Sequence, residues 1–171
     1  MSIYGIIILP HIFFLDPKDY VSFVLSDSYI GQLLCSVFIQ FCVSDLIIGC
    51  LDYNSHIKFL EGWVHHIYYI IILSLFKIYG ITNSFYAFSW CEIPTLILSV
   101  GILCPSLKSY DMFVLSFVAF RVVMFSYFYL MFYFHCSWNM LYITIAPISI
   151  ILLTHIYWLA NLLQSVRKKA A

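Results

Sequence analysis

The segment His65-His66-Ile67-Tyr68-Tyr69-Ile70-Ile71-Ile72-Leu73-Ser74-Leu75-Phe76 decides the class of this fold. Two adjacent histidines begin a run of apolar and aromatic residues, in a chain that is 64% hydrophobic and 9% charged. An ordinary soluble domain carries about a quarter charged residues, so the composition indicates an integral membrane protein. An imidazole in hydrocarbon needs a polar partner or water. The histidine pair therefore predicts a polar functional centre inside the membrane.

Apolar segments recur along the chain at the length of about 20 residues that a helix needs to cross a bilayer. The predicted spans are 30–51, 63–81, 84–104, 112–134 and 140–163. The stretch 3–15 is apolar but short and is interrupted by Pro10, so a sixth crossing stays open. We therefore expect an all-α integral membrane protein, a bundle of five to six transmembrane helices around a lipid-accessible cavity. The expected domains are a short apolar N-terminal segment with a polar surface loop over 16–27 (together 1–29), a transmembrane domain (30–163) and a basic cytosolic tail (164–171).

The basic residues of the turns and the tail predict the orientation. With Arg167-Lys168-Lys169 in the cytosol, five crossings put Lys58 and Lys108 on the same side, as the positive-inside rule requires. The chain ends Lys168-Lys169-Ala170-Ala171, the spacing of a dilysine address for the endoplasmic reticulum. The alternative is that these residues anchor the last helix at anionic headgroups. Both interpretations predict a multi-pass protein with a cytosolic C-terminus.

Ionisable residues inside the predicted spans should avoid lipid tails. The ones that we single out are Asp45, His65, His66, Lys77, Glu92 and Arg121. At about 1.5 Å per residue from the cytosolic ends, Asp45 lies about 9 Å deep, Arg121 about 14 Å and Glu92 about 18 Å. These depths overlap, so we expect the side chains to share one cavity.

Glu92 and Arg121 lie at similar depth on consecutive antiparallel spans, which predicts a buried ion pair. The alternative is that Glu92 orients an imidazole or accepts its proton. Pro94 interrupts the backbone hydrogen bonding beside Glu92, and such breaks often accompany a site in a membrane protein. For Glu92 the sequence favours neither interpretation, whereas for Arg121 it favours pairing.

Neighbouring histidines on a helix point about 100° apart, so His65 and His66 should have separate roles. One imidazole would act as a base or nucleophile, and the other would bind a headgroup or hold the local geometry. The alternative is an interfacial anchor, in which both rings lie among headgroups beside Trp63, with Tyr68 and Tyr69 further in. Composition and spacing alone favour the anchor.

Other classes of site receive weaker support. Metal ligands of suitable type are Asp45, Asp52, His56, His65, His66 and Glu92, but they lack the spacing of a helical ligand pair, and we expect no metal or other cofactor. The six cysteines include no CxxC pair, which indicates buried structural thiols. A formal net charge of zero gives no basic face for nucleic acid. The paired, broken segments typical of transporters are not evident in this sequence.

The order of several short motifs changes the balance between these interpretations. In sequence they are Ser44-Asp45-Leu46-Ile47-Ile48-Gly49, Leu51-Asp52-Tyr53, Gly62-Trp63-Val64-His65-His66, Glu92-Ile93-Pro94-Thr95, Pro105-Ser106-Leu107-Lys108 and Phe120-Arg121. Together they resemble the TLC family, named for TRAM, Lag and CLN proteins, over 33–163. The resemblance implies a TLC-like helical bundle in the endoplasmic reticulum membrane that makes, senses or distributes lipids. Its best-known enzymes, the ceramide synthases, use a histidine pair that corresponds to His65 and His66 to join an acyl group from acyl-CoA to a sphingoid amine.

The synthase signature continues with His-Asp and a second aspartate, whereas this chain has no His-Asp dipeptide and offers only Glu92 within 84–95. The resemblance is therefore closer to TLC proteins of lipid homeostasis, which would bind a membrane lipid or acyl chain in the cavity. The alternative is an acyl-CoA-dependent N-acyltransferase of sphingolipid metabolism. The predicted catalytic residues are His65, His66, Asp45 and Glu92, and the predicted substrate-binding residues are Asp52, Trp63, Tyr69 and Arg121. The sequence gives no oligomeric state.

Overall fold

The computed structural model describes residues 12, 14–52, 59–137 and 144–170, apart from the side chains of 52, 59–61 and 165–170. These parts of the chain are helical and contain no strand. The helices are α2 (Pro17–Val24), α3 (Tyr29–Asp52), η1 (Phe59–Val64), α4 (His65–Tyr79), α5 (Asn83–Phe88), η2 (Ser89–Glu92), α6 (Ile93–Leu103), η3 (Pro105–Leu107), α7 (Tyr110–Ser116), η4 (Phe117–Met124), α8 (Phe125–His135) and α10 (Ala146–Ala170). They form two compact units: a hairpin unit (Ser22–Ala87), and a C-terminal unit (Phe88–Ala171 with Met1–Val21).

Four helices in the described parts are long and apolar enough to cross a membrane, so the protein is an all-α membrane protein. Their bounds are Tyr29–Leu51, Asn83–Leu103, Tyr110–His135 and Ala146–Gln164, close to four of the predicted spans. The span predicted at 63–81 is not among them. Its helix α4 has 15 residues, or about 22 Å, against a hydrocarbon core of about 30 Å, and the π-helical η1 precedes it directly. The five-crossing topology therefore stays a prediction.

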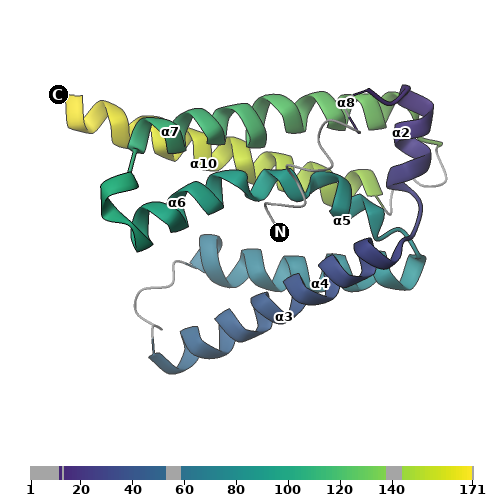
Figure 1. Ribbon diagram of the computed structural model, residues 1–171, viewed down its shortest axis with the longest axis horizontal. Helices are drawn as coiled ribbons and strands as arrows, with labels where there is room; N and C mark the ends of the chain where they lie inside the picture. The colour runs from purple at the N-terminus through teal and green to yellow at the C-terminus, as the bar shows by residue number, and fades with distance from the viewer. Residues whose placement is uncertain (1–11, 13, 53–58, 138–143, 171) are drawn as a thin grey trace. The chain divides into compact units, whose positions relative to one another are not determined.

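In the hairpin unit, α3 and α4 run side by side in opposite directions (Figure 1). Phe38 of α3 is the centre of their apolar contact, with ring centroids 5.3 Å from Tyr69 and 5.1 Å from Phe85. The last turn of α4 ends at Gly80, whose φ of 66° is left-handed. Glycine adopts this conformation without steric cost, and the Gly80 N–H then satisfies carbonyls of the last turn. The turn reverses the chain toward α5.

A polar corner closes the hairpin unit where the segment before α3 meets the segment after α4. The hydroxyl of Thr82 donates to the carboxylate of Asp27, and Nδ2 of Asn83 donates to Oγ of Ser26 at 2.9 Å. Gly31 makes this approach possible, because a Cβ there would lie 2.6 Å from Oγ1 of Thr82 and 2.9 Å from its backbone carbon. The corner therefore depends on a residue without a side chain at Gly31.

Hydrogen bonds from Thr82, and then from Gln32, hold the pKa of Asp27 below its usual value. A depressed carboxyl pKa stabilises the folded state above the pKa of the unfolded chain, about 3.9, and this contribution disappears as the pH falls through the folded pKa. We therefore expect Thr82→Val, which keeps the shape but not the donor, to raise the pKa of Asp27. The variant should therefore unfold at a lower temperature than the wild type near pH 7, and its unfolding temperature should fall less between pH 5 and pH 3, because less of the depressed pKa remains to be lost.

The measurement is the thermal unfolding midpoint of detergent-purified protein between pH 7 and pH 3. Thr154→Val is the matched control, because the Thr154 hydroxyl donates to the carbonyl of Ile150 in its own helix at 2.8 Å and contacts no carboxylate. Superimposable pH profiles for Thr82→Val and the wild type would contradict the assignment.

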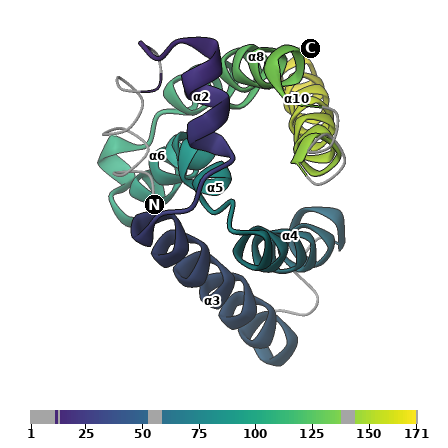
Figure 2. The same cartoon turned by 90° about the vertical axis from the view of Figure 1, so that its right-hand side faces the viewer.

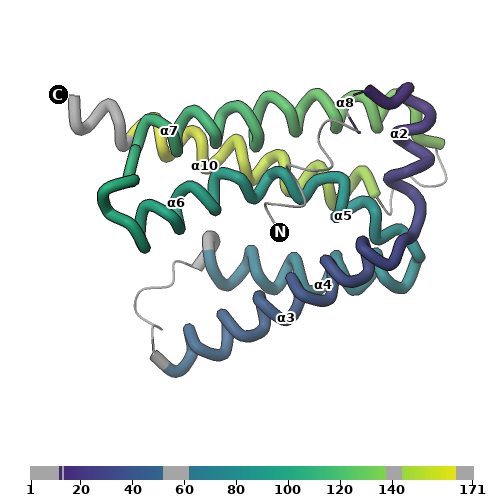
Figure 3. The backbone as a smooth tube through the Cα atoms, in the orientation of Figure 1, coloured from purple at the N-terminus to yellow at the C-terminus, as the bar shows by residue number. Residues whose placement is uncertain are grey.

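The C-terminal unit packs α6, the α7–η4–α8 helix and α10 around an aromatic core (Figure 2). The backbone passes from α7 through η4 to α8 as one continuous helix (Figure 3). Trp90 is fully buried, with ring centroids 6.4 Å from Phe125 and 5.7 Å from Phe128. At the start of α7 the Ser109 hydroxyl caps the helix by accepting from the Met112 N–H at 3.2 Å. This packing fixes the three helices that carry the polar residues described below.

The prediction of a polar surface loop over 16–27 is wrong, because residues Pro17–Val24 form α2. Tyr20 and Val24 are both fully buried, and their spacing of four residues places them on one helical face. The ring of Tyr20 lies 5.2 Å from that of Phe128. Burial of these side chains outweighs the polar residues Lys18 and Asp19 at the start of the helix. Most of the apolar stretch 3–15 lies outside the described residues.

Candidate functional site

A close contact between a histidine and an acid joins the two helices of the hairpin unit. Nδ1 of His66, at the start of α4, lies 3.1 Å from Oδ2 of Asp45 on α3. The contact is an ion pair only while the imidazole is protonated, and the oxygen is out of line for a hydrogen bond from the ring N–H. The His66 side chain is 13% exposed and that of Asp45 is 47% exposed. The imidazole is therefore largely enclosed, while the carboxylate remains accessible.

His65 points elsewhere, as expected for adjacent residues on a helix. Its ring lies edge-on to Tyr69 at 4.7 Å between centroids, whereas the ring of His66 lies edge-on to Phe41 at 6.0 Å. The two imidazole centroids are 5.7 Å apart. The hairpin unit thus gathers four predicted site residues, Asp45, His65, His66 and Tyr69. Trp63 lies in the π-helical η1 directly before them.

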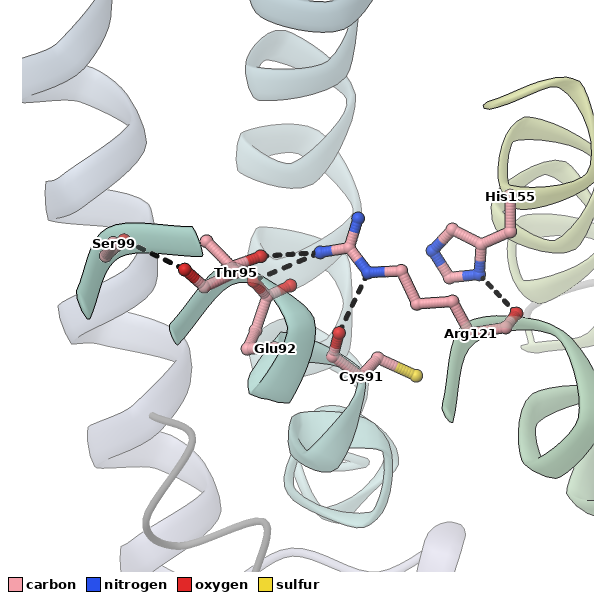
Figure 4. A network of polar contacts seen from close by, with 6 residues as sticks. All are labelled: Cys91, Glu92, Thr95, Ser99, Arg121 and His155. Carbon is pink, nitrogen blue, oxygen red and sulfur yellow. Dashed lines mark hydrogen bonds and ion pairs between the residues drawn. The ribbon is translucent and has the colours of Figure 1, made fainter. Parts of the chain in front are cut away.

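A second polar cluster lies in the C-terminal unit, around the break that Pro94 introduces (Figure 4). The 3-10 turn η2 (Ser89–Glu92) directs each carbonyl toward the N–H three residues later. For Cys91 that residue is Pro94, which has no N–H. Nε of Arg121 donates to the Cys91 carbonyl instead, at 2.9 Å. The proline therefore leaves an acceptor that a side chain from η4 satisfies.

The predicted ion pair between Glu92 and Arg121 is confirmed. Nη2 of Arg121 lies 3.4 Å from Oε2 of Glu92 and donates to Oγ1 of Thr95 at 2.7 Å. The pair is not the two-pronged fork that Arg can form with a carboxylate, because Nε is directed to the Cys91 carbonyl. The Arg121 and Glu92 side chains are 12% and 17% exposed. Removal of one charge would therefore leave the other in an apolar setting.

Aromatic rings complete the surroundings of Arg121. Its guanidinium carbon lies 5.5 Å from the ring centroid of Phe117 and 5.5 Å from that of Trp158. An aromatic face attracts a cation, and the attraction is strongest where water is excluded. The rings therefore stabilise the charge in addition to Glu92.

His155 of α10 belongs to this cluster, although no motif or spacing in the sequence singled it out. The side chain is 2% exposed, and Nδ1 lies 3.0 Å from the carbonyl oxygen of Arg121. Arg121 lies in the π-helical η4, and such turns are frequent at functional sites. Since a carbonyl only accepts, Nδ1 carries the proton in this contact. His155 therefore holds the backbone of the residue whose side chain reaches Glu92.

The described residues thus bring the predicted site residues together in two clusters, one within each unit. Asp45 contacts a histidine, and Glu92 contacts Arg121. Of these two predicted catalytic acids, Asp45 is therefore the one that lies beside the histidine pair. The side chain of Asp52 and the whole of His56 lie outside the described residues. No group of three or more His, Cys, Asp or Glu side chains suited to a metal occurs in the described part of the chain. The single cavity shared by all these residues stays a prediction.

The chain matches no protein-family model, no curated protein and no solved structure. The TLC resemblance therefore rests on the sequence motifs, and the function is argued from the two clusters.

Proposed function

We propose that this membrane protein belongs to the TLC type and functions in lipid metabolism or homeostasis in the endoplasmic reticulum by binding a lipid or acyl chain within the membrane. The observation that carries the proposal is the Asp45–His66 pair, which joins two apolar helices at 3.1 Å while the Asp45 side chain remains 47% exposed. A charged group at membrane depth requires a polar partner. The polar headgroup of a lipid supplies one, while the apolar faces beside it accept the chains.

The residues have distinct roles in this proposal. Asp45 and His66 bind the headgroup, and His65 and Tyr69 form the aromatic wall next to it. Asp52, at the end of α3, and Trp63, in η1, would contact the headgroup from the membrane surface. In the C-terminal unit, Arg121 is a separate lipid-binding position, and Glu92 holds Arg121.

An acyl-CoA-dependent N-acyltransferase is the second candidate, because the Asp45 carboxylate lies 3.1 Å from Nδ1 of His66, close enough to orient the imidazole once a small rotation brings the N–H into line. In that reaction the amine nitrogen attacks the thioester carbonyl as His66 accepts the amine proton. The C–N bond forms, the C–S bond breaks, and the CoA thiolate leaves and receives the proton from His66. The products are an N-acyl lipid and CoA.

Lipid mass spectrometry of the purified protein tests the proposal. We expect the wild type to retain one class of lipid, and we expect His66→Ala and Asp45→Asn each to lower its occupancy at least tenfold. His135→Ala is the matched control, because His135 is exposed at the end of α8 and contacts the Met131 carbonyl of its own helix. Folding is checked by elution as a single species on gel filtration.

Labelled acyl-CoA supplied with long-chain amines separates the two candidates. A new N-acyl lipid that disappears in His65→Ala or His66→Ala would favour the acyltransferase. Lipid retained equally by all variants, with no product formed, would overturn both functions.

A further inference from the structure

The outer edge of the Arg121 guanidinium carries hydrogen-bond donors that the protein does not use. A guanidinium has five N–H donors. Nε donates to the Cys91 carbonyl, and Nη2 is directed to Thr95 and Glu92. Nη1 has no hydrogen-bond partner among the described residues, and in Figure 4 it points away from these three acceptors. One edge of a largely buried cation is therefore open to an acceptor from outside the chain.

The surroundings restrict how such an acceptor approaches. The rings of Phe117 and Trp158 each lie 5.5 Å from the guanidinium carbon, so they occupy space against the flat group. The hydrogen bond from His155 to the Arg121 carbonyl fixes the backbone of Arg121 itself. A ligand therefore reaches the guanidinium along one of the N–H bonds of Nη1, which diverge from each other. That geometry suits a single acceptor oxygen.

Charge and depth together select the kind of oxygen. Glu92 already neutralises Arg121, so a phosphate or carboxylate would add an uncompensated negative charge to the cluster. Arg121 lies eleven residues into the span that begins at Tyr110, about 16 Å along the helix. That depth is near the middle of a hydrocarbon core of about 30 Å, well inside the headgroup phosphates. A neutral carbonyl oxygen satisfies both conditions.

We propose that Nη1 of Arg121 binds the acyl carbonyl of an uncharged lipid, an ester or an amide. The inference rests on the proposed lipid-binding function and names the chemical class of the ligand. Phe117 and Trp158 contact the chain beside the carbonyl, and Thr95, Glu92 and Cys91 hold the guanidinium so that its free edge faces the ligand.

A matched pair of probes tests the carbonyl directly. Dioctanoylglycerol has two ester carbonyls, and 1,2-di-O-octylglycerol has the same chains joined by ethers. Each probe is titrated into detergent-purified protein, and the thermal unfolding midpoint gives its apparent affinity. We expect the ester to bind at least tenfold more tightly than the ether, the loss expected for one hydrogen bond to a charged group. Equal affinities would overturn the proposal. Tighter binding of dioctanoyl phosphatidic acid than of the neutral ester would also overturn it, in favour of an anion site.

Two variants assign the preference to the free edge. Arg121→Lys keeps a cation beside Glu92 but removes the fork of donors, so we expect the ester and ether affinities to become equal. Thr95→Val removes a partner of Nη2 and leaves Nη1 in place, so we expect the preference to remain. A preference that persists in Arg121→Lys would overturn the assignment. If that lysine variant does not purify as a single species, the ester, ether and phosphatidic acid affinities of the wild type decide whether the carbonyl site exists.

The two proposals fail in different ways. If His66→Ala abolishes retained lipid but the wild type does not discriminate ester from ether, the proposed function stands and the carbonyl site is wrong. If an ester preference persists in His66→Ala and that variant retains lipid, the carbonyl site stands and the role of the Asp45–His66 pair is wrong.

Discussion

Arg121→Met is expected to lower the free energy of unfolding by about 3–5 kcal/mol, the usual cost of removing one partner of a buried ion pair. The substitution leaves Glu92, whose side chain is 17% exposed, without its cation. It also removes the donors to the Cys91 carbonyl and to Thr95. Most of the protein should then aggregate on extraction from the membrane. The readouts are the monodisperse fraction on gel filtration and the thermal unfolding midpoint.

A second substitution separates charge from packing. The double variant Glu92→Gln/Arg121→Met removes both charges, so it should recover most of the stability lost in Arg121→Met alone. Lys18→Met is the matched control, because Lys18 is exposed and its loss should leave the midpoint unchanged. If the double variant were as unstable as the single variant, the ion pair would not be the source of the effect.

Gly31→Val is expected to destabilise the hairpin unit by about 1–3 kcal/mol, the usual cost of overpacking. A Cβ at Gly31 would meet Oγ1 of Thr82 at 2.6 Å and the Thr82 backbone carbon at 2.9 Å. The side-chain atom can rotate away, whereas the backbone carbon cannot. Gly31→Ala should be milder than Gly31→Val, and both should lower the thermal unfolding midpoint.

The double variant Gly31→Ala/Thr82→Ala tests this cause, because it removes the hydroxyl but not the backbone carbon. We expect the double variant to recover only part of the thermal unfolding midpoint that Gly31→Ala loses. Gly101→Ala is the matched control, since a Cβ there first meets Lys108 Cα at 3.3 Å. Equal losses from Gly101→Ala and Gly31→Ala would contradict a special role for the polar corner.

Hydropathy predicted four of the spans to within a few residues, because a membrane-crossing helix needs a fixed apolar length. The predicted start of the last span, at residue 140, lies outside the described residues. The Glu92–Arg121 pair was also predictable, since depth along consecutive antiparallel helices limits which charges can meet. The π-helical turns η1 and η4 were not predictable, because no residue type is typical of such turns. Because η4 could not be predicted, the sequence did not indicate that His155, a single histidine in an apolar helix, would contact the backbone of Arg121.

The remaining errors and omissions have physical causes. The helix α2 was missed because it is short and begins with Pro17-Lys18-Asp19, a sequence typical of loops, although the spacing of Tyr20 and Val24 could have indicated it. For the histidine pair, the sequence showed that the two rings diverge but not which one meets an acid. That choice depends on the rotation of α4 against α3, which the packing of Phe38 and Tyr69 sets.

The π-helical turn η4 gives this protein an unusual tolerance of one kind of deletion. A π turn contains about one residue more than an α-helix needs for the same turn. Deleting a single codon within Phe117–Met124 would therefore let the helix close into a regular α-helix while its two halves keep their relative rotation. The aromatic side chains of Phe125, Phe128 and Phe132, now buried, would still face their partners. A deletion of one codon in the regular helix α8 would instead rotate the residues beyond it by about 100° and turn their side chains away from the core.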